Sequence, residues 1–288
     1  MKNNNDSRPI IVSIRCTAYN QEKYIRQCLD GFIMQQTNLR FEAIVHDDAS
    51  TDGTADIIRE YEKKYPDIIK PIYEEENQYS KHDGSLVRIM DEHTRGVYVA
   101  ICEGDDYWTE PSKLQKQYDF MESHPECSMC FHSHNNLYPN GKLGLVEPCE
   151  KKEEYTTPDV IKFKSNVIGT NTVFYRYHFY KEEERPLFWK RSPVGDLPMK
   201  LYFASKGTIG FINANMSVYR WGAEGGWTSR KTTLKQRTKH HRAIIEMYSQ
   251  YDEYTGYQYH KYIMRAKNRI WSLIVKDCLT IGRKLFKE

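Results

Sequence analysis

The sequence predicts an α/β protein built on a mostly parallel central sheet flanked by helices. Short apolar runs rich in β-branched residues alternate with segments in which apolar residues recur at helical spacing. This alternation places consecutive strands in one sheet through right-handed crossovers. Three of the runs end in carboxylate or hydroxyl side chains. We expect these ends to meet at the carboxyl edge of the sheet, where ligands of open α/β folds bind.

The first hundred residues supply strands and helices in regular alternation. Strands are predicted at 10–14, 41–45, 68–73 and 97–101. Helices are predicted at 24–33, 54–61 and 86–93. Ser50 and Thr54 flank an Asp-Gly turn, which is typical chemistry for the start of the second helix.

The rest of the chain is patterned less regularly. A helix beginning after Pro111 and ending near Ser123 comes next, and residues 134–160 are expected to be loop-rich. Strands are predicted at 127–131, 172–175, 209–212 and 216–219, with a helix that begins at Asp196. From Thr232 to the end the pattern is helical and basic, so 231–288 is predicted to be a helical C-terminal extension.

Composition excludes some classes of protein. The 42 Lys and Arg residues against 39 Asp and Glu residues give a net charge of +3, which argues against a general nucleic-acid surface. No apolar run has the length of a membrane span, and the first eight residues are polar. The odd number of cysteines, seven, favours reduced thiols. We therefore expect a cytoplasmic protein that does not bind nucleic acid.

The most informative stretch follows the fourth predicted strand, where Glu103, Asp105 and Asp106 surround Gly104. Carboxylates gathered at a strand end repel one another unless a cation or donor groups lie between them. Mg²⁺ or Mn²⁺ bridging a diphosphate suits such hard oxygen ligands. A solvated acidic loop is the alternative, and an Asp-Asp pair considered by itself would usually be one.

Two further carboxylate positions allow two interpretations each. Asp47 and Asp48 end the second strand, where they could accept hydrogen bonds from a nucleobase or a ribose, or interact with a helix dipole. Asp196 follows a Pro-Val-Gly turn and opens an apolar helix. It could be a general base or an N-cap, and the residues alone favour the cap.

Three other segments were weighed for function. Cys127, Cys130, His132 and His134 could suggest zinc, but they alternate along a predicted strand without a second knuckle, so zinc is disfavoured. The glycine-rich segment 221–227, with a tryptophan at each end, is either a lid over a ligand or a surface loop. Apolar residues of the tail interleave with lysine and arginine, a pattern that fits either packing on the domain or an anionic membrane surface. They are Trp271, Leu273, Ile274, Leu279, Ile281, Leu285 and Phe286.

Together these motifs resemble the family-two glycosyltransferases of the GT-A fold, which move a sugar from a nucleotide diphosphate donor. The resemblance is carried by the stretches 12–25, 44–54 and 103–108. It continues more weakly through Gly195-Asp196 and 218–220, and fades after about residue 230. It implies a GT-A domain over 1–230, with a nucleotide-sugar-binding half at 8–106 and an acceptor half at 107–230.

The resemblance also implies roles for single residues. Nucleotide binding falls to Thr17, Ala18, Tyr19, Glu22, Asp48, Glu103 and Gly104. Tyr19 stacks on the base, Asp48 bonds the base (uracil), and Asp105 and Asp106 hold Mn²⁺ or Mg²⁺. Asp196 becomes the catalytic base of an inverting transfer, in place of the cap that the residues alone favour.

Two positions depart from the family pattern. Glu103 stands where aspartate is usual, and Gly222 stands where many relatives have a histidine that contacts metal or phosphate. The expected function is a cytoplasmic, metal-dependent hexosyltransferase, peripheral on the inner membrane face, that takes a UDP-sugar donor and a glycan or lipid-linked acceptor. The alternatives are a nucleotidyltransferase, disfavoured by the segment Thr17-Ala18-Tyr19-Asn20 where a glycine-rich loop is needed, and a non-catalytic sugar-nucleotide-binding module.

Overall fold

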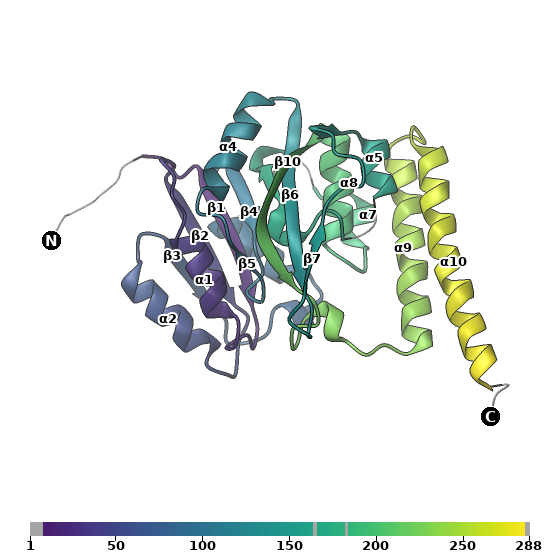
Figure 1. Ribbon diagram of the computed structural model, residues 1–288, viewed down its shortest axis with the longest axis horizontal. Helices are drawn as coiled ribbons and strands as arrows, with labels where there is room; N and C mark the ends of the chain where they lie inside the picture. The colour runs from purple at the N-terminus through teal and green to yellow at the C-terminus, as the bar shows by residue number, and fades with distance from the viewer. Residues whose placement is uncertain (1–7, 164–165, 182–183, 286–288) are drawn as a thin grey trace.

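A computed structural model describes residues 8–163, 166–181 and 184–285. One large sheet lies at the centre, with helices on both of its faces, and two long C-terminal helices lie side by side at one end (Figure 1). The predicted α/β class with C-terminal helices is confirmed.

The N-terminal half alternates as predicted. Its strands are β1 (Val12–Ala18), β2 (Phe41–Asp47), β3 (Ile69–Tyr73) and β4 (Tyr98–Ile101). They pair in parallel in the order β3-β2-β1-β4. The intervening helices are α1 (Ile25–Ile33), α2 (Thr54–Lys64), the 3₁₀ turn η1 (Tyr79–Lys81) and α3 (Ser85–His93). The first two strands continue further than predicted, so Thr17 and Ala18 belong to β1 and Asp47 belongs to β2.

The second half of the chain completes the same sheet. Its strands are β5 (Tyr107–Trp108), β6 (Cys127–Leu137), β7 (Leu143–Val146), β8 (Glu154–Tyr155), β9 (Phe174–Arg176) and β10 (Thr208–Arg220). Strand β9 is antiparallel to both β4 and β6, and β10 is parallel to β6. Consequently β6 and β10 run in the same direction as β1–β4, which makes the sheet mostly parallel.

Two predictions for this half need correction. Residues 134–160, predicted to be loop-rich, contain more regular structure than expected: β6 continues through Leu137 and turns back into β7, and β8 and helix α5 (Thr157–Lys162) follow. The two strands predicted at 209–212 and 216–219 are one strand, β10, with irregular register between Ile212 and Ser217. Polar residues within buried strands made both segments look like turns.

The remaining helices surround this half of the sheet. They are α4 (Lys113–Ser123), η2 (Thr170–Thr172), α6 (Tyr177–Lys181), α7 (Leu187–Lys190), α8 (Asp196–Lys206), η3 (Trp227–Ser229), α9 (Leu234–Tyr254) and α10 (His260–Leu285). Thr233 and Gln236 form a capping box at the start of α9. The C-terminal helices therefore begin close to Thr232, where the sequence pattern predicts them.

Two hydrophobic cores hold the fold together. One packs β1, β2 and β4 against α1, α2 and α4, and the other packs β6, β9 and β10 against α5, α7, α8, α9 and α10. The buried Tyr251 of α9 donates its hydroxyl to the carbonyl of Leu201 in α8, at 3.0 Å. The C-terminal helices thus share a core with the rest of the chain. The division at residue 230 remains a prediction. No helix within the described residues has an apolar stretch long enough to cross a bilayer.

Candidate active site

The carboxyl ends of β1, β2 and β4 are joined by backbone hydrogen bonds. The N–H of Asp48 donates to the carbonyl of Ala18 at 2.9 Å, and the N–H of Gly104 donates to the carbonyl of Thr17 at 3.0 Å. The polar residues that end the three strands therefore lie at one edge of the sheet, as predicted.

The turn after β4 packs tightly against the end of β1. A Cβ at Gly104 would lie 2.2 Å from Oε1 of Gln21 and 3.2 Å from the Cβ of Ala18, so a larger residue would have to displace the end of Gln21 and would crowd Ala18. The hydroxyl of Thr17 donates to the carboxylate of Glu103. Burial raises the pKa of Glu103 to about 7, the charge of Asp105 adds to the rise, and the bond from Thr17 opposes it.

Asp106 is the most deeply placed of the clustered carboxylates, at 1% exposed. Its Oδ1 accepts the backbone N–H of Arg220 from β10 at 2.9 Å, and its Oδ2 is buried without a partner. Burial, and then the charge of Asp105, raises the pKa of Asp106. Asp105 is half-buried, and its pKa is raised by burial and lowered by the charge of Arg220.

These carboxylates fit a hard divalent cation. They raise each other's pKa, and one buried oxygen has no donor, so a cation would relieve both conditions. Mg²⁺ is commonly bound through one or two carboxylates together with substrate phosphates. Asp105 and Asp106 could supply that number, with the remaining ligands coming from a diphosphate and water.

Within the described residues, one group of three candidate ligand atoms lies within 4.8 Å of one another, and it is elsewhere: His124, Glu126 and Glu154. It lies at the amino end of β6, away from the strand-end carboxylates. The stretch considered for zinc, and disfavoured, lies in the buried strand β6: Cys127 and Cys130 are buried, and His132 pairs with the carbonyl of Ser133 at 2.8 Å.

The residues expected to bind the nucleotide are placed in different ways. Tyr19 is open, at 46% exposed. Asp48 is buried, and its two carboxylate oxygens accept the N–H groups of Gln78 and Tyr79 at 2.6 and 3.0 Å. Glu22 is exposed and accepts the N–H of Gly53 at 3.2 Å, so its carboxylate faces the start of α2. Asp48 therefore holds Gln78 and Tyr79, at the start of η1, beside the strand ends.

The segment 221–226 runs from the end of β10 across to α1. Gly222 and Gly225 have φ values of 79° and 78°, which favour glycine. Glu224 pairs with Lys23 at 2.6 Å. A Cβ at Gly226 would lie 3.1 Å from Oδ2 of Asp105. This segment, for which the sequence allows either a lid or a surface loop, thus lies against Asp105. The side chain of Trp227 lies outside the described residues.

Asp196 is the first residue of α8, and Gly195 occupies the N-cap position. The side chain of Asp196 is 38% exposed, and its Oδ2 lies 2.6 Å from the ammonium of Lys200. Tyr219 of β10 interacts electrostatically with both Asp196 and the acidic cluster. Burial raises the pKa of Tyr219 to about 12, and the charges of Asp106, Asp105 and Asp196 contribute to this rise. The three aspartates therefore lie within electrostatic reach of one tyrosine.

Sequence reasoning did not assign three neighbours of this site: Tyr219, Arg220 and Lys200. The guanidinium of Arg220 lies over the rings of Tyr24 and Tyr107, 5.1 and 4.8 Å from their centroids. Tyr219 and Arg220 lie on β10, more than a hundred residues after the acidic cluster. Lys200 could have been found, because it stands one helical turn after Asp196.

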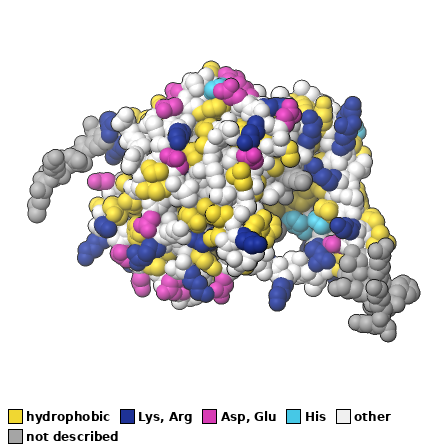
Figure 2. Space-filling view, in the orientation of Figure 1, with side chains coloured by type: hydrophobic (Ala, Val, Ile, Leu, Met, Phe, Trp, Pro, Cys, Tyr) yellow, Lys and Arg dark blue, Asp and Glu magenta, His cyan; other side chains and the backbone are white. Residues whose placement is uncertain are grey.

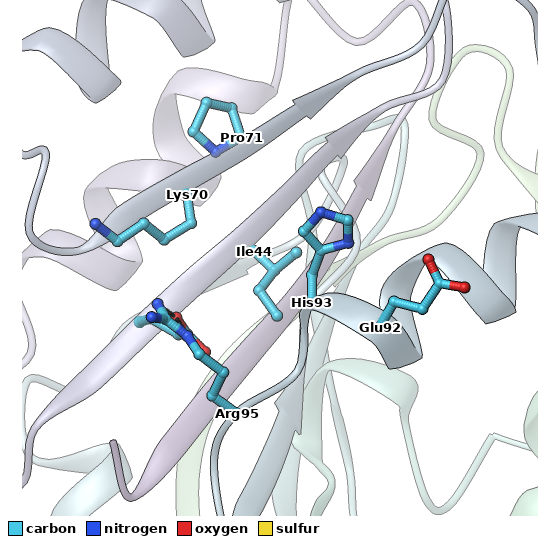
Figure 3. A pocket seen from close by; sticks show the side chains of 7 residues that line it. Ile44, Lys70, Pro71, Glu92, His93 and Arg95 are labelled. Atoms are coloured by element: carbon cyan, nitrogen blue, oxygen red, sulfur yellow. Dashed lines mark hydrogen bonds and ion pairs between the residues drawn. The ribbon is translucent and has the colours of Figure 1, made fainter. Parts of the chain in front are cut away.

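An open pocket of about 340 Å³ lies at the opposite, amino edge of the sheet (Figure 3). It is lined by Glu42, Ile44, Lys70, Pro71, Glu92, His93 and Arg95. Glu42 forms an ion pair there with Arg95 and accepts the hydroxyl of Ser13 at 2.7 Å. On the face shown in Figure 2, acidic and basic side chains are interspersed, as expected from the balanced composition.

Comparison with known proteins identifies the family. The model of glycosyl transferase family 2 matches residues 13–186. An uncharacterised protein of Mycobacterium tuberculosis is 37% identical over 231 residues, which are 78% of this chain and 63% of that protein. The chain therefore spans less than two thirds of the length of this relative. An Escherichia coli protein, the UDP-Glc:α-D-GlcNAc-diphosphoundecaprenol β-1,3-glucosyltransferase WfaP, is 32% identical over 128 residues, 44% of this chain and 46% of its own.

Among solved structures, Staphylococcus aureus TarS (residues 1–349, with UDP-GlcNAc) superimposes with a TM-score of 0.62. The match covers 83% of this chain and 66% of TarS at 20% identity, which supports the fold alone. The family model spans more than half of the sequence, and the motifs that it includes meet at one edge of the sheet. The chain belongs to glycosyl transferase family 2.

Proposed function

We propose that the protein transfers a hexose from a UDP-sugar to a hydroxyl of a glycan or lipid-linked acceptor, with inversion at the anomeric carbon. The observation that carries this proposal is that Asp105, Asp106 and Asp196 all lie within electrostatic reach of one tyrosine, Tyr219. Asp105 and Asp106 suit a cation and a diphosphate, and Asp196 is a separate, partly exposed carboxylate.

The donor base is proposed to bind between Tyr19 and Asp48. The exposed ring of Tyr19 offers a stacking surface. A carboxylate accepts about four hydrogen bonds, so Asp48 retains acceptor capacity for the N–H of a uracil after bonding Gln78 and Tyr79. Uridine is favoured because TarS was crystallised with UDP-GlcNAc and the Escherichia coli relative is named for UDP-Glc. Thr17, Ala18, Glu103 and Gly104 would form the floor beneath the nucleotide.

The diphosphate is proposed to lie beside Asp105, under the segment 221–226. Mn²⁺ or Mg²⁺ held by Asp105 and Asp106 would supply charge neutralisation to the departing diphosphate. Gly222, which replaces the family's histidine, offers no further ligand from its side chain. Gly226 leaves space next to Asp105, because any Cβ there would approach Oδ2.

Asp196 is proposed to be the general base. It would take the proton of the acceptor hydroxyl while the hydroxyl oxygen attacks the anomeric carbon from the side opposite the diphosphate. The bond from that carbon to the phosphate oxygen breaks as the glycosidic bond forms, so the configuration inverts. The hydroxyl of Tyr219 stays neutral within reach of the charges of both carboxylate groups, which is compatible with this division of roles.

The test of the donor assignment is thermal unfolding with nucleotides. In the presence of Mn²⁺ we expect UDP to raise the unfolding midpoint by several degrees, since saturation at about 100 times Kd stabilises by about 2.7 kcal/mol. EDTA should remove most of the effect, and GDP should give little. Equal protection by GDP would contradict the uracil assignment, and no protection by either nucleotide would contradict the donor site.

We also propose a peripheral contact with anionic membrane through α10. Met264, Trp271, Val275 and Leu279 are at least 37% exposed and recur along one side of this helix, whereas Ile274 is buried. Exposed Lys261 and Arg265 lie near that side, where anionic headgroups would attract them. The side chains of Ile281 and Leu285, and all of Phe286, lie outside the described residues.

Sedimentation with vesicles tests this contact. The protein should sediment with vesicles of phosphatidylglycerol and phosphatidylcholine, and should remain in the supernatant with phosphatidylcholine alone. Replacing Trp271 and Leu279 together with serine should abolish binding and preserve the unfolding midpoint, because both side chains are exposed. Unchanged sedimentation of this variant would show that another surface makes the contact.

A further inference from the structure

An ion pair in the first turns of α8 joins Asp196 to Lys200, and the reaction described above gives Lys200 no role. Nζ of Lys200 lies 2.6 Å from Oδ2 of Asp196, one helical turn earlier. The side chain of Lys200 is 5% exposed, whereas that of Asp196 is 38% exposed. The ammonium group of the pair is therefore buried, whereas its carboxylate is partly exposed to solvent.

Each member of the pair constrains the other. An ammonium so well shielded from water needs a counter-charge, and Asp196 provides it. In turn, the short charge-assisted hydrogen bond fixes one oxygen of Asp196, so the carboxylate does not rotate freely. The exposed part of the carboxylate is thereby held in one orientation at the start of α8.

We propose that Lys200 is a positioning residue for Asp196, whose carboxylate it keeps ionised and oriented to accept the proton of an acceptor hydroxyl. This inference rests on the proposed role of Asp196 as general base. Lys200 itself need not touch the substrate, because its ammonium is already directed at Asp196 and lies behind it. The residue would act through the protonation state and the orientation of the base.

Among the described residues, two further titratable groups interact with the pair, and both are neutral at neutral pH. His134 of β6 faces Lys200, and burial together with the charge of Lys200 lowers the pKa of His134 to about 4. Tyr219 of β10 interacts electrostatically with Asp196, and burial together with the charges of Asp106, Asp105 and Asp196 raises its pKa to about 12, so it stays protonated. Burial by itself would raise the pKa of Asp196, but the charge and hydrogen bond of Lys200 lower it below its usual value. Lys200 is thus the cation that counters burial.

The experiment titrates the Asp196 carboxyl directly by NMR, using protein labelled with ¹³C at the aspartate carboxyl and the Asp196→Asn variant to assign the resonance. Transfer rates alone would not isolate this group, because Glu103 has a pKa of about 7. Lys200→Met should raise the pKa of Asp196 by about 1 to 3 pH units, the usual effect of losing a close opposite charge. Lys200→Arg should restore most of the wild-type value.

Kinetics provide the second measurement. The acid limb of kcat/KM should move to higher pH in Lys200→Met, and Lys200→Arg should return it. Lys235→Met, at an exposed position of α9, is the matched control and should change neither the titration nor the profile. If Lys200→Met does not fold, Lys200→Gln removes the charge and keeps a polar side chain.

An Asp196 pKa that is the same in Lys200→Met and the wild type would overturn the proposal, and so would equal loss of transfer at every pH. The proposed function fails in a different way. If Asp196→Asn keeps full transfer activity, Asp196 is not the base, while the NMR titration still decides whether Lys200 controls its ionisation.

Discussion

Asp196→Asn is expected to lower kcat for sugar transfer by about 10²- to 10⁴-fold, the usual contribution of a positioned general base. Asparagine keeps the size of the side chain and an oxygen that can accept from Lys200, but it cannot take a proton from the acceptor. Binding of UDP with Mn²⁺ should be unchanged, because Asp196 is paired with Lys200 and is not among the residues proposed to hold the cation or the nucleotide. Donor affinity by calorimetry and transfer by product formation measure the two effects separately.

The ion pair with Lys200 complicates this variant and also supplies its control. Asparagine leaves a buried ammonium without a counter-charge, and breaking a fully buried pair costs about 3–5 kcal/mol. The cost should be smaller here because Asp196 is 38% exposed. The double variant Asp196→Asn/Lys200→Met removes both charges, so its unfolding midpoint should recover while transfer remains lost. Recovery of transfer together with stability would show that Asp196 acts only by holding Lys200.

The fold of the N-terminal half follows from local patterns in the sequence. Its strands are short apolar runs, its helices have one apolar face, and polar residues mark the end of each strand. Because β1, β2 and β4 are parallel, their carboxyl ends lie at the same edge of the sheet. The proximity of Thr17, Asp48 and Glu103 could therefore be predicted from the sequence. The pattern alone could not show that the oxygens of Asp48 are already bonded to Gln78 and Tyr79.

The second half shows where local patterns fail. Strand β6 lies between β9 and β10 in the sheet, although part of its sequence is typical of a turn. Its buried polar residues are His132, Ser133, His134 and Asn136. The irregular register of β10 interrupts the alternation that would have identified it as one strand. Pairings between segments far apart in the sequence decide both cases, and no short window of residues contains that information.

The same distinction applies to the site. The acidic cluster is contiguous in the sequence, so its chemistry was predictable, whereas Arg220 reaches Asp106 from a strand more than a hundred residues later. The residues around Asp196 do not identify it as a base, because a position before an apolar helix is typical of an N-cap. The structure shows that Gly195 is the N-cap and that Asp196 pairs with Lys200.

Asp105→Asn is expected to remove metal-dependent donor binding and to lower transfer on the order of 10²- to 10³-fold, comparable to losing one preorganised charge contact with the leaving group. Asp105 is the more accessible of the two aspartates proposed as ligands. It also lies against Gly226 of the segment 221–226, beside which the diphosphate is proposed to bind. The neutral amide keeps the shape of the side chain but is a much weaker ligand for Mn²⁺ than a carboxylate.

Asp106→Asn should behave differently, because Asp106 has a structural bond as well. Its Oδ1 accepts the N–H of Arg220, and the side chain is 1% exposed, so substitution there is expected to lower the unfolding midpoint as well as activity. Asp105→Asn should keep its midpoint without nucleotide and lose the increase that UDP and Mn²⁺ give the wild type. Asp56→Asn, at an exposed position of α2, is the matched control and should keep both. Full Mn²⁺-dependent protection in Asp105→Asn would show that Asp105 is not a ligand of the cation.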